Sequence, residues 1–210
     1  MITKKYVEYL YATPIHTIDF LDTNFCDDIK HHLKNLQKNN IGRDDVLCFI
    51  TSDDLHKRTE FFNLNEILLN ETNKVLDEIG LIRDNIFITN MWANISKADN
   101  RHATHLHANS LYSGVLYIEA DERSGNIGFK DPRIAKEMLD FNWKDDSIFK
   151  HRTIEFQPKK GRLILFPSWM YHGTKRGKFN INEDRISLSF NVLPKSKSNS
   201  FSRTAIFTDK

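Results

Sequence analysis

Three histidines stand close together in the segment RHATHLHANSLYSGVLYIEA, residues 101–120. His105 and His107 are separated by one residue, so on an extended segment both side chains lie on the same face, as two ligands of one metal ion require. His172 ends the apolar run GRLILFPSWMYH, which is typical of a strand buried on both faces. We therefore expect His105, His107 and His172 to converge on one metal ion. Imidazole ligands alone do not select among iron, zinc, copper and nickel.

A second chemical pattern follows in RISLSFNVLP, residues 185–194, where polar and apolar residues alternate. Alternation gives a strand one polar and one apolar face. If the polar face points into the protein, Arg185 offers a guanidinium fork to a carboxylate and Ser187 adds a hydroxyl beside it. Tyr117, in SGVLYIE, can bring a phenol to the same anion. The alternative is an edge strand whose polar face lies in water.

The elements that must position these residues change in character near residue 84. Before it, segments 22–40 and 64–80 carry apolar stripes at helical spacing, and short strands are expected near Pro14. After it, short runs rich in Ile, Val, Phe and Tyr alternate with Gly, Pro, Asn and Asp, which is typical of a sandwich or barrel. We predict a mainly β protein with flanking helices.

Composition excludes several classes of protein. The 210 residues carry a net charge of +2, which is too mild to indicate nucleic acid or an anionic membrane as partner. Neither a signal peptide nor a long apolar segment is seen, and the two cysteines, Cys26 and Cys48, have no partner spacing. We expect a cytoplasmic protein with two free thiols.

Taken in order, the motifs HxH, SGVLYIEA, SGNIGFKDPR, FPSWMYH and RISLSFN resemble the iron(II)- and 2-oxoglutarate-dependent oxygenases. The resemblance spans about residues 85–194 and is closest to a branch with the pattern HxH, SGvxY, FPswxxH and RxSxsFN. It implies a double-stranded β-helix core, also called a jelly roll or cupin-like fold. We expect one domain over 1–210, with a mixed N-terminal flanking region (1–84), the core (85–194) and a tail (195–210).

The resemblance also implies roles for individual residues. His105 matches the first metal ligand of the family, and His172 matches the distal histidine. Tyr117 and Arg185 match contacts to the 2-oxoglutarate carboxylate, and Ser187 belongs to the RxS element that accompanies the arginine. The implied cofactors are Fe(II), 2-oxoglutarate and O2, with no catalytic side chain beyond the metal centre.

The implied reaction couples decarboxylation of 2-oxoglutarate, to succinate and CO2, with oxidation of a substrate by O2. We expect a hydroxylase. The substrate, a small molecule or a protein side chain, is not determined by the sequence, and neither is the oligomeric state. Two other functions stay open: a cupin-type iron dioxygenase with three histidine ligands that needs no 2-oxoglutarate, and a non-catalytic jelly-roll protein that binds a metal or acts as a scaffold.

One position departs from the family pattern of two histidines and a carboxylate, because His107 stands where the carboxylate is usual. We favour a metal site with three histidines. The alternatives are a carboxylate from elsewhere, such as Asp99 or Asp121, or a shifted register that uses His107 with Asn109. His102 is expected beside the site or at the surface. Four residues are expected to line the pocket: Trp92, Asn94, Asn109 and Tyr112.

Overall fold

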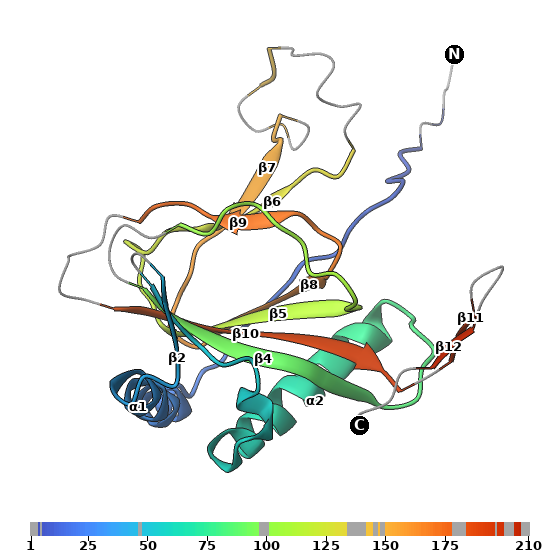
Figure 1. The fold of residues 1–210 in the computed structure, drawn as a ribbon. Coiled ribbons are helices and arrows are strands. Elements are labelled where there is room, and N and C mark those ends of the chain that lie inside the picture. The colour runs from blue at the N-terminus through green and yellow to red at the C-terminus, as the bar shows by residue number, and fades with distance from the viewer. Residues whose placement is uncertain are drawn as a thin grey trace.

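The computed structural model describes residues 4, 6–45, 48–96, 101–133, 142–144, 147, 150–177, 184–195, 197–199 and 204–206. Two antiparallel β-sheets face each other, and two α-helices lie on the outer side of the larger sheet (Figure 1). This is the mainly β architecture with flanking helices that the sequence predicts. Within the described residues, no helix is both long and apolar enough to cross a membrane.

The larger sheet has seven strands in the order β1-β8-β5-β10-β4-β3-β2. Their bounds are β1 His16–Asp19, β2 Gly42–Asp45, β3 Cys48–Thr51, β4 Ile86–Ser96, β5 Tyr112–Glu119, β8 Arg162–Pro167 and β10 Arg185–Pro194. The smaller sheet has the order β7-β6-β9. Its strands are β6 Ile127–Lys130, β7 Thr153–Phe156 and β9 His172–Thr174.

Both predicted helices are confirmed: α1 spans Asn24–Lys38 and α2 spans Phe62–Glu78, preceded by the 3-10 turns η1 Leu55–Lys57 and η2 Thr59–Phe61. Each helix buries one stripe at helical spacing against the larger sheet, because only that face is apolar. The buried residues of α1 are Cys26, Ile29, Leu33 and Leu36. Those of α2 are Leu64, Leu68, Thr72, Val75 and Leu76. Cys26 and Cys48 are both buried, and no disulfide joins them.

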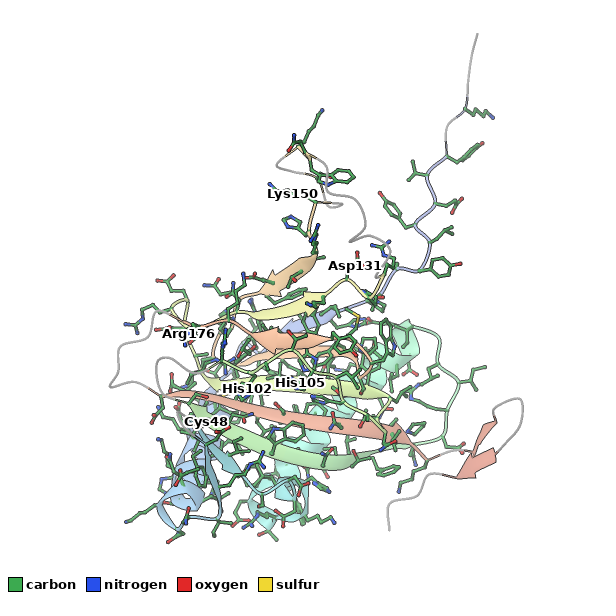
Figure 2. The ribbon with its side chains drawn as sticks, turned by 45° about the horizontal axis from the view of Figure 1, so that its top comes forward. Cys48, His102, His105, Asp131, Lys150 and Arg176 are labelled. Carbon is green, nitrogen blue, oxygen red and sulfur yellow. The ribbon has the colours of Figure 1, made fainter. Side chains whose placement is uncertain are left out.

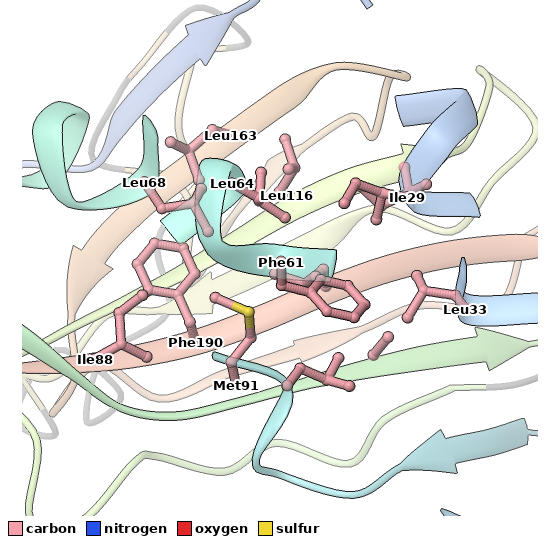
Figure 3. Close-up of a cluster of buried hydrophobic side chains, with 14 of the residues drawn as sticks. Ile29, Leu33, Phe61, Leu64, Leu68, Ile88, Met91, Leu116, Leu163 and Phe190 are labelled. Carbon is pink, nitrogen blue, oxygen red and sulfur yellow. The ribbon is translucent and has the colours of Figure 1, made fainter. Parts of the chain in front are cut away.

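The apolar side chains form two cores, one on each face of the larger sheet. The first lies between this sheet and the helices; it includes Phe61, Met91 and Phe190 (Figure 3). The second lies between the two sheets and includes Tyr117, Phe129 and Phe166. The inner faces of the two sheets are therefore only partly filled by apolar groups, and the remaining space is available for a site.

The N-terminal region contributes more to the sheet than its sequence indicates. β1 pairs with β8, and β2 and β3 extend the sheet beyond β4. No strand is predicted over 42–51, and β2, with the sequence GRDD, is exposed along its whole length. β2 nevertheless forms, because it pairs along its whole length with the largely buried β3. In the tail, β11 (Lys197–Asn199) and β12 (Thr204–Ile206) pair with each other.

Candidate metal centre

Three histidine side chains converge between the two sheets. His105 lies in the loop before β5 and forms an isolated bridge with His172, the first residue of β9. His107 follows on the same loop, and its backbone N–H donates to the Ser168 carbonyl at 3.0 Å. One ring nitrogen from each histidine lies within 4.8 Å of the others, and the Nε2 atoms of His105 and His107 are 3.3 Å apart. The structure therefore brings together the three residues that the sequence singles out.

Hydrogen bonds orient all three rings in the same way. Each Nδ1 faces an oxygen acceptor: Ala103 O at 2.8 Å from His105, Asn191 Oδ1 at 2.5 Å from His107, and Met170 O at 2.9 Å from His172. An acceptor at Nδ1 selects the tautomer that carries its proton there. The lone pair then sits on Nε2, so that each ring turns a donor atom of the kind that metals bind toward the centre.

A polar network supports His107 from behind. Ser113 Oγ lies 3.0 Å from His107 Nδ1, and it hydrogen-bonds to Asn191 Oδ1 at 2.7 Å and to Ser168 Oγ at 2.8 Å. Asn191 Nδ2 in turn donates to Asn90 Oδ1 at 2.8 Å, which holds the Asn191 amide with its oxygen toward the histidine. Sequence reasoning missed these supporting residues.

Burial keeps two of the imidazoles neutral. Burial lowers the pKa of His107, although the hydrogen bond that His107 Nδ1–H donates to Asn191 Oδ1 acts in the opposite direction. Burial also lowers the pKa of His172 to about 4, with the Met170 carbonyl acting against the shift. His105 is more exposed than either. Neutral imidazole is the form that binds a metal ion. The rings of His107 and His172 can therefore bind a metal near neutral pH without first losing a proton.

No carboxylate joins the three histidines among the residues that the structure describes. Asp121 lies in the turn after β5, where it accepts hydrogen bonds from the backbone and side chain of Arg123. Asp99 lies outside the described residues. The shifted register with Asn109 is wrong: Asn109 is an exposed turn residue with a φ of 59°, so the chain leaves the extended path after His107.

A cavity of about 670 Å³ between the sheets contains the three histidines. Trp92 and Asn94, on β4, line it as expected. Tyr112 does not, and its assignment to the pocket is wrong: on β5 it faces the helices, where it belongs to the core that includes Phe190. The assignment of Asn109 to the pocket is also wrong, since the turn carries it to the surface.

The predicted alternation of β10 is confirmed, with its polar face inside. Ile186, Leu188 and Phe190 belong to the core against the helices. Arg185 and Ser187 line the cavity, and both are buried. The edge-strand alternative is wrong, because β10 is hydrogen-bonded on both sides, to β4 and to β5, and most residues of its polar face are buried.

Arg185, Ser187 and Tyr117 form one end of the cavity. The Arg185 guanidinium carbon lies 5.1 Å from the centroid of the Tyr117 ring, and Arg185 Nη1 reaches Ser187 Oγ at 3.5 Å. Tyr117 is fully buried, and burial raises the pKa of its phenol, so the hydroxyl stays a donor. Among the described residues, Tyr117 Oη and Arg185 Nε have no hydrogen-bond partner. Buried donors without partners are costly, which indicates that a ligand completes this end.

The sheet register separates this end from the histidines. Ser187 pairs with Tyr117, whereas Asn191, which contacts His107, pairs with Ser113. Four residues along a strand span roughly 13 Å. The Arg185 guanidinium lies near the Tyr117 ring, at the level of Ser187, and one cavity includes both this end and the histidines, so an elongated ligand can lie between them.

Comparison with known proteins agrees with this geometry. The profile of the family described as "Putative 2OG-Fe(II) oxygenase" matches residues 90–191, a segment that runs from β4 to β10 and includes all three histidines. No protein with a curated description matches the sequence.

Several solved structures share the fold at low sequence identity. HygX from Streptomyces hygroscopicus, solved with nickel and 2-oxoglutarate bound, is 14% identical with a TM-score of 0.62 over 87% of this chain and 83% of that one. A prolyl-4-hydroxylase from Pseudomonas putida is 12% identical, with a TM-score of 0.58 over 87% and 94%. The viral collagen prolyl hydroxylase vCPH from Paramecium Bursaria Chlorella virus-1 is 14% identical, with a TM-score of 0.56 over 85% and 94%.

The matched profile and the double-stranded β-helix fold indicate the same class of protein. Over residues 90–191, just under half of its length, the chain is similar to the iron(II)/2-oxoglutarate-dependent oxygenases, a superfamily of oxidoreductases, and it shares their fold. The cofactors of this class are Fe(II), 2-oxoglutarate and O2.

Proposed function

We propose that this chain is a hydroxylase that holds Fe(II) with His105, His107 and His172. The observation that carries the proposal is the shared cavity: one ring nitrogen from each of three histidines converges in it, and Tyr117 Oη and Arg185 Nε, two buried donors without partners among the described residues, lie in the same space. A non-catalytic metal-binding protein would need the three converging histidines but not the two buried donors. When bound, the iron supplies the oxidation of substrate by O2, with conversion of 2-oxoglutarate to succinate and CO2.

The residues of the chain then have separate tasks. The three histidines hold the metal through neutral imidazoles, and Asn191 and Ser113 fix the ring of His107. Arg185, with Tyr117 and Ser187 beside it, binds the distal carboxylate of 2-oxoglutarate, because a buried guanidinium is best compensated by an anion. Among the described residues, no carboxylate forms an ion pair with Arg185 that would already fill this role.

We place the substrate in the remaining part of the cavity, toward β3 and β2. This part is lined by Ile50, Ser52, Asn90, Trp92 and Asn94. The cavity falls within the ~300–1,000 Å³ that ligand sites usually occupy. Its mixture of an indole ring with amides and a hydroxyl suits a polar small molecule or a polar side chain of another protein.

The test uses the purified chain with Fe(II) under anaerobic conditions. Addition of 2-oxoglutarate is expected to produce the visible absorbance of a keto acid bound to Fe(II), and admission of O2 is expected to yield succinate. The cupin-type alternative predicts metal binding without this absorbance and no succinate. Absence of both signals in a protein that binds the metal would contradict the proposal.

A further inference from the structure

His102 belongs to the cavity, although the sequence places it only near the site. Its backbone N–H donates to Thr174 Oγ1 at 2.9 Å, and its carbonyl accepts from the Thr174 backbone N–H at 3.1 Å. A side chain at Gly173 would meet the His102 carbonyl at 2.8 Å, so the loop can lie this close to β9 only beside glycine. Figure 2 labels His102 and His105, which lie close together on this loop. The position of His102 is therefore fixed by the backbone.

The side chain of His102 carries a buried polar atom with no partner. His102 Nε2 is inaccessible to solvent and makes no hydrogen bond with any residue that the structure describes, as is true of Tyr117 Oη and Arg185 Nε. All three residues line the same cavity. Buried polar atoms are almost always satisfied in folded proteins, so three such atoms around one space call for a common explanation. The three atoms come from three different elements, so imperfect packing of one element does not explain why all three lack a partner.

The charge around His102 indicates that the ligand that would satisfy these three atoms is an anion. Burial, together with the positive charge of the nearby Arg185 guanidinium, lowers the pKa of His102 to about 4. The ring is then neutral near neutral pH, and its Nε2–H can act as a donor. Together with Arg185 and Tyr117, it makes this end of the cavity a set of donors, which suits the acceptor oxygens of a carboxylate.

We propose that His102 Nε2 donates a hydrogen bond to the distal carboxylate of 2-oxoglutarate, beside Arg185 and Tyr117. The proposal rests on the function proposed above and adds a residue that the family pattern does not assign. Because His102 stands three residues before His105 on the same loop, the bound carboxylate also holds the loop that carries two metal ligands. Co-substrate and metal should then strengthen each other's binding.

The experiment replaces His102 in two ways. His102→Leu removes the donor, whereas His102→Gln keeps an amide N–H at about the distance of Nε2 from the backbone. His56→Leu is the matched control, since His56 is also half-buried with an unpartnered ring nitrogen but does not line the cavity. Dissociation constants are measured by anaerobic calorimetry on the nickel-loaded proteins. The two ligands are 2-oxoglutarate and 2-oxobutyrate, which has the keto-acid end but no distal carboxylate.

We expect His102→Leu to weaken 2-oxoglutarate binding about tenfold or more, as for loss of a hydrogen bond to a charged group. Binding of 2-oxobutyrate and of nickel alone should change less than about twofold, and His102→Gln should recover most of the loss. His56→Leu should bind both ligands as the wild type does. If His102→Leu does not fold, as judged by circular dichroism, His102→Asn replaces it, because its amide ends short of Nε2.

Three results would overturn the inference. Equal 2-oxoglutarate affinity in wild type and His102→Leu would show that no such contact exists and would leave the proposed function intact. Equal weakening of 2-oxoglutarate and 2-oxobutyrate would place the effect at the metal loop instead of the carboxylate. Equal losses in the Leu and Gln variants would exclude the donor role. No 2-oxoglutarate binding in the wild type itself would instead overturn the proposed function.

Discussion

His105 and His172 are joined by two backbone hydrogen bonds, since each backbone N–H donates to the other residue's carbonyl at 2.9 Å. This isolated antiparallel bridge links the loop before β5 to the first residue of β9. It brings the two imidazole rings to a centroid distance of 4.5 Å. Because the main chain makes the bridge, either side chain can be replaced without removing it.

Replacement of His172 therefore tests the metal centre with little disturbance of the fold. His172→Gln is expected to abolish tight Fe(II) or nickel binding, a larger loss than the ~10–100-fold seen when only a partner of a ligand is removed. The circular dichroism spectrum should stay that of the wild type. Metal titration by calorimetry measures the effect, with His31→Gln on the exposed face of α1 as the control. Unchanged metal affinity in His172→Gln would contradict the assignment.

Asn191 is expected to tune metal affinity without touching the metal. Asn191→Leu removes the oxygen that accepts the His107 Nδ1 proton, so metal binding should weaken roughly 10–100-fold. Asn191→Asp keeps an acceptor at this position and should weaken metal binding less than Asn191→Leu does. Ser189→Ala is the matched control, because Ser189 lies on the same face of β10 but has no hydrogen bond to His107. Similar affinities in the Leu variant and the wild type would show that the network does not support the ligand.

Strand parity explains how much of this site the sequence could predict. Arg185, Ser187 and Asn191 are separated by even numbers of residues, so one face of β10 carries all three, and the sequence shows this directly. Tyr112 and Tyr117 are five residues apart, so parity alone sends them to opposite faces. Tyr112 was placed in the pocket because of its residue type. Its spacing from Tyr117 already contradicted that placement.

Other features depend on pairing between distant segments, which no local pattern encodes. Asn90 and Ser168 join the His107 network only because β4 and the end of β8 lie beside β10 and β5. β2 forms from a uniformly polar segment because β3 offers a free edge. Asn109 appeared to continue the HxH pattern, but the chain turns there with a positive φ.

Gly114 is expected to be required for packing between β5 and β10. A Cβ at this position would lie 2.3 Å from a ring carbon of Phe190 and 2.9 Å from Leu165 Cδ2, and both side chains are fully buried. Gly114→Ala should lower the free energy of unfolding by about 1–3 kcal/mol, as for overpacking of a core. Urea denaturation measures the change. Gly128→Ala should cost less, because its nearest neighbour is a methyl of the partly exposed Thr153.

Asp19 is expected to stabilise the fold in a pH-dependent way. It pairs with Arg162 across β1 and β8, and the Arg162 hydrogen bonds lower the pKa of Asp19 to about 2. A depressed pKa means that the stabilisation is present above the pKa of the unfolded chain, near ~4, and is lost as pH falls toward 2. Denaturation curves at several pH values should show wild type and Asp19→Asn converging over this range. A constant difference between them would contradict the pair's contribution.

Arg185→Lys is expected to separate co-substrate binding from metal binding. Lysine keeps the charge but loses the planar fork, so 2-oxoglutarate binding should weaken by about 1–3 kcal/mol, as for a charge-assisted hydrogen bond. Metal affinity should stay within about twofold, since the sheet register places Arg185 six residues along β10 from Asn191, which supports the metal end. An anaerobic titration of the Fe(II) protein with 2-oxoglutarate, followed by visible absorbance, measures both proteins. Equal affinities would mean that the buried guanidinium serves the fold and that the carboxylate is held elsewhere.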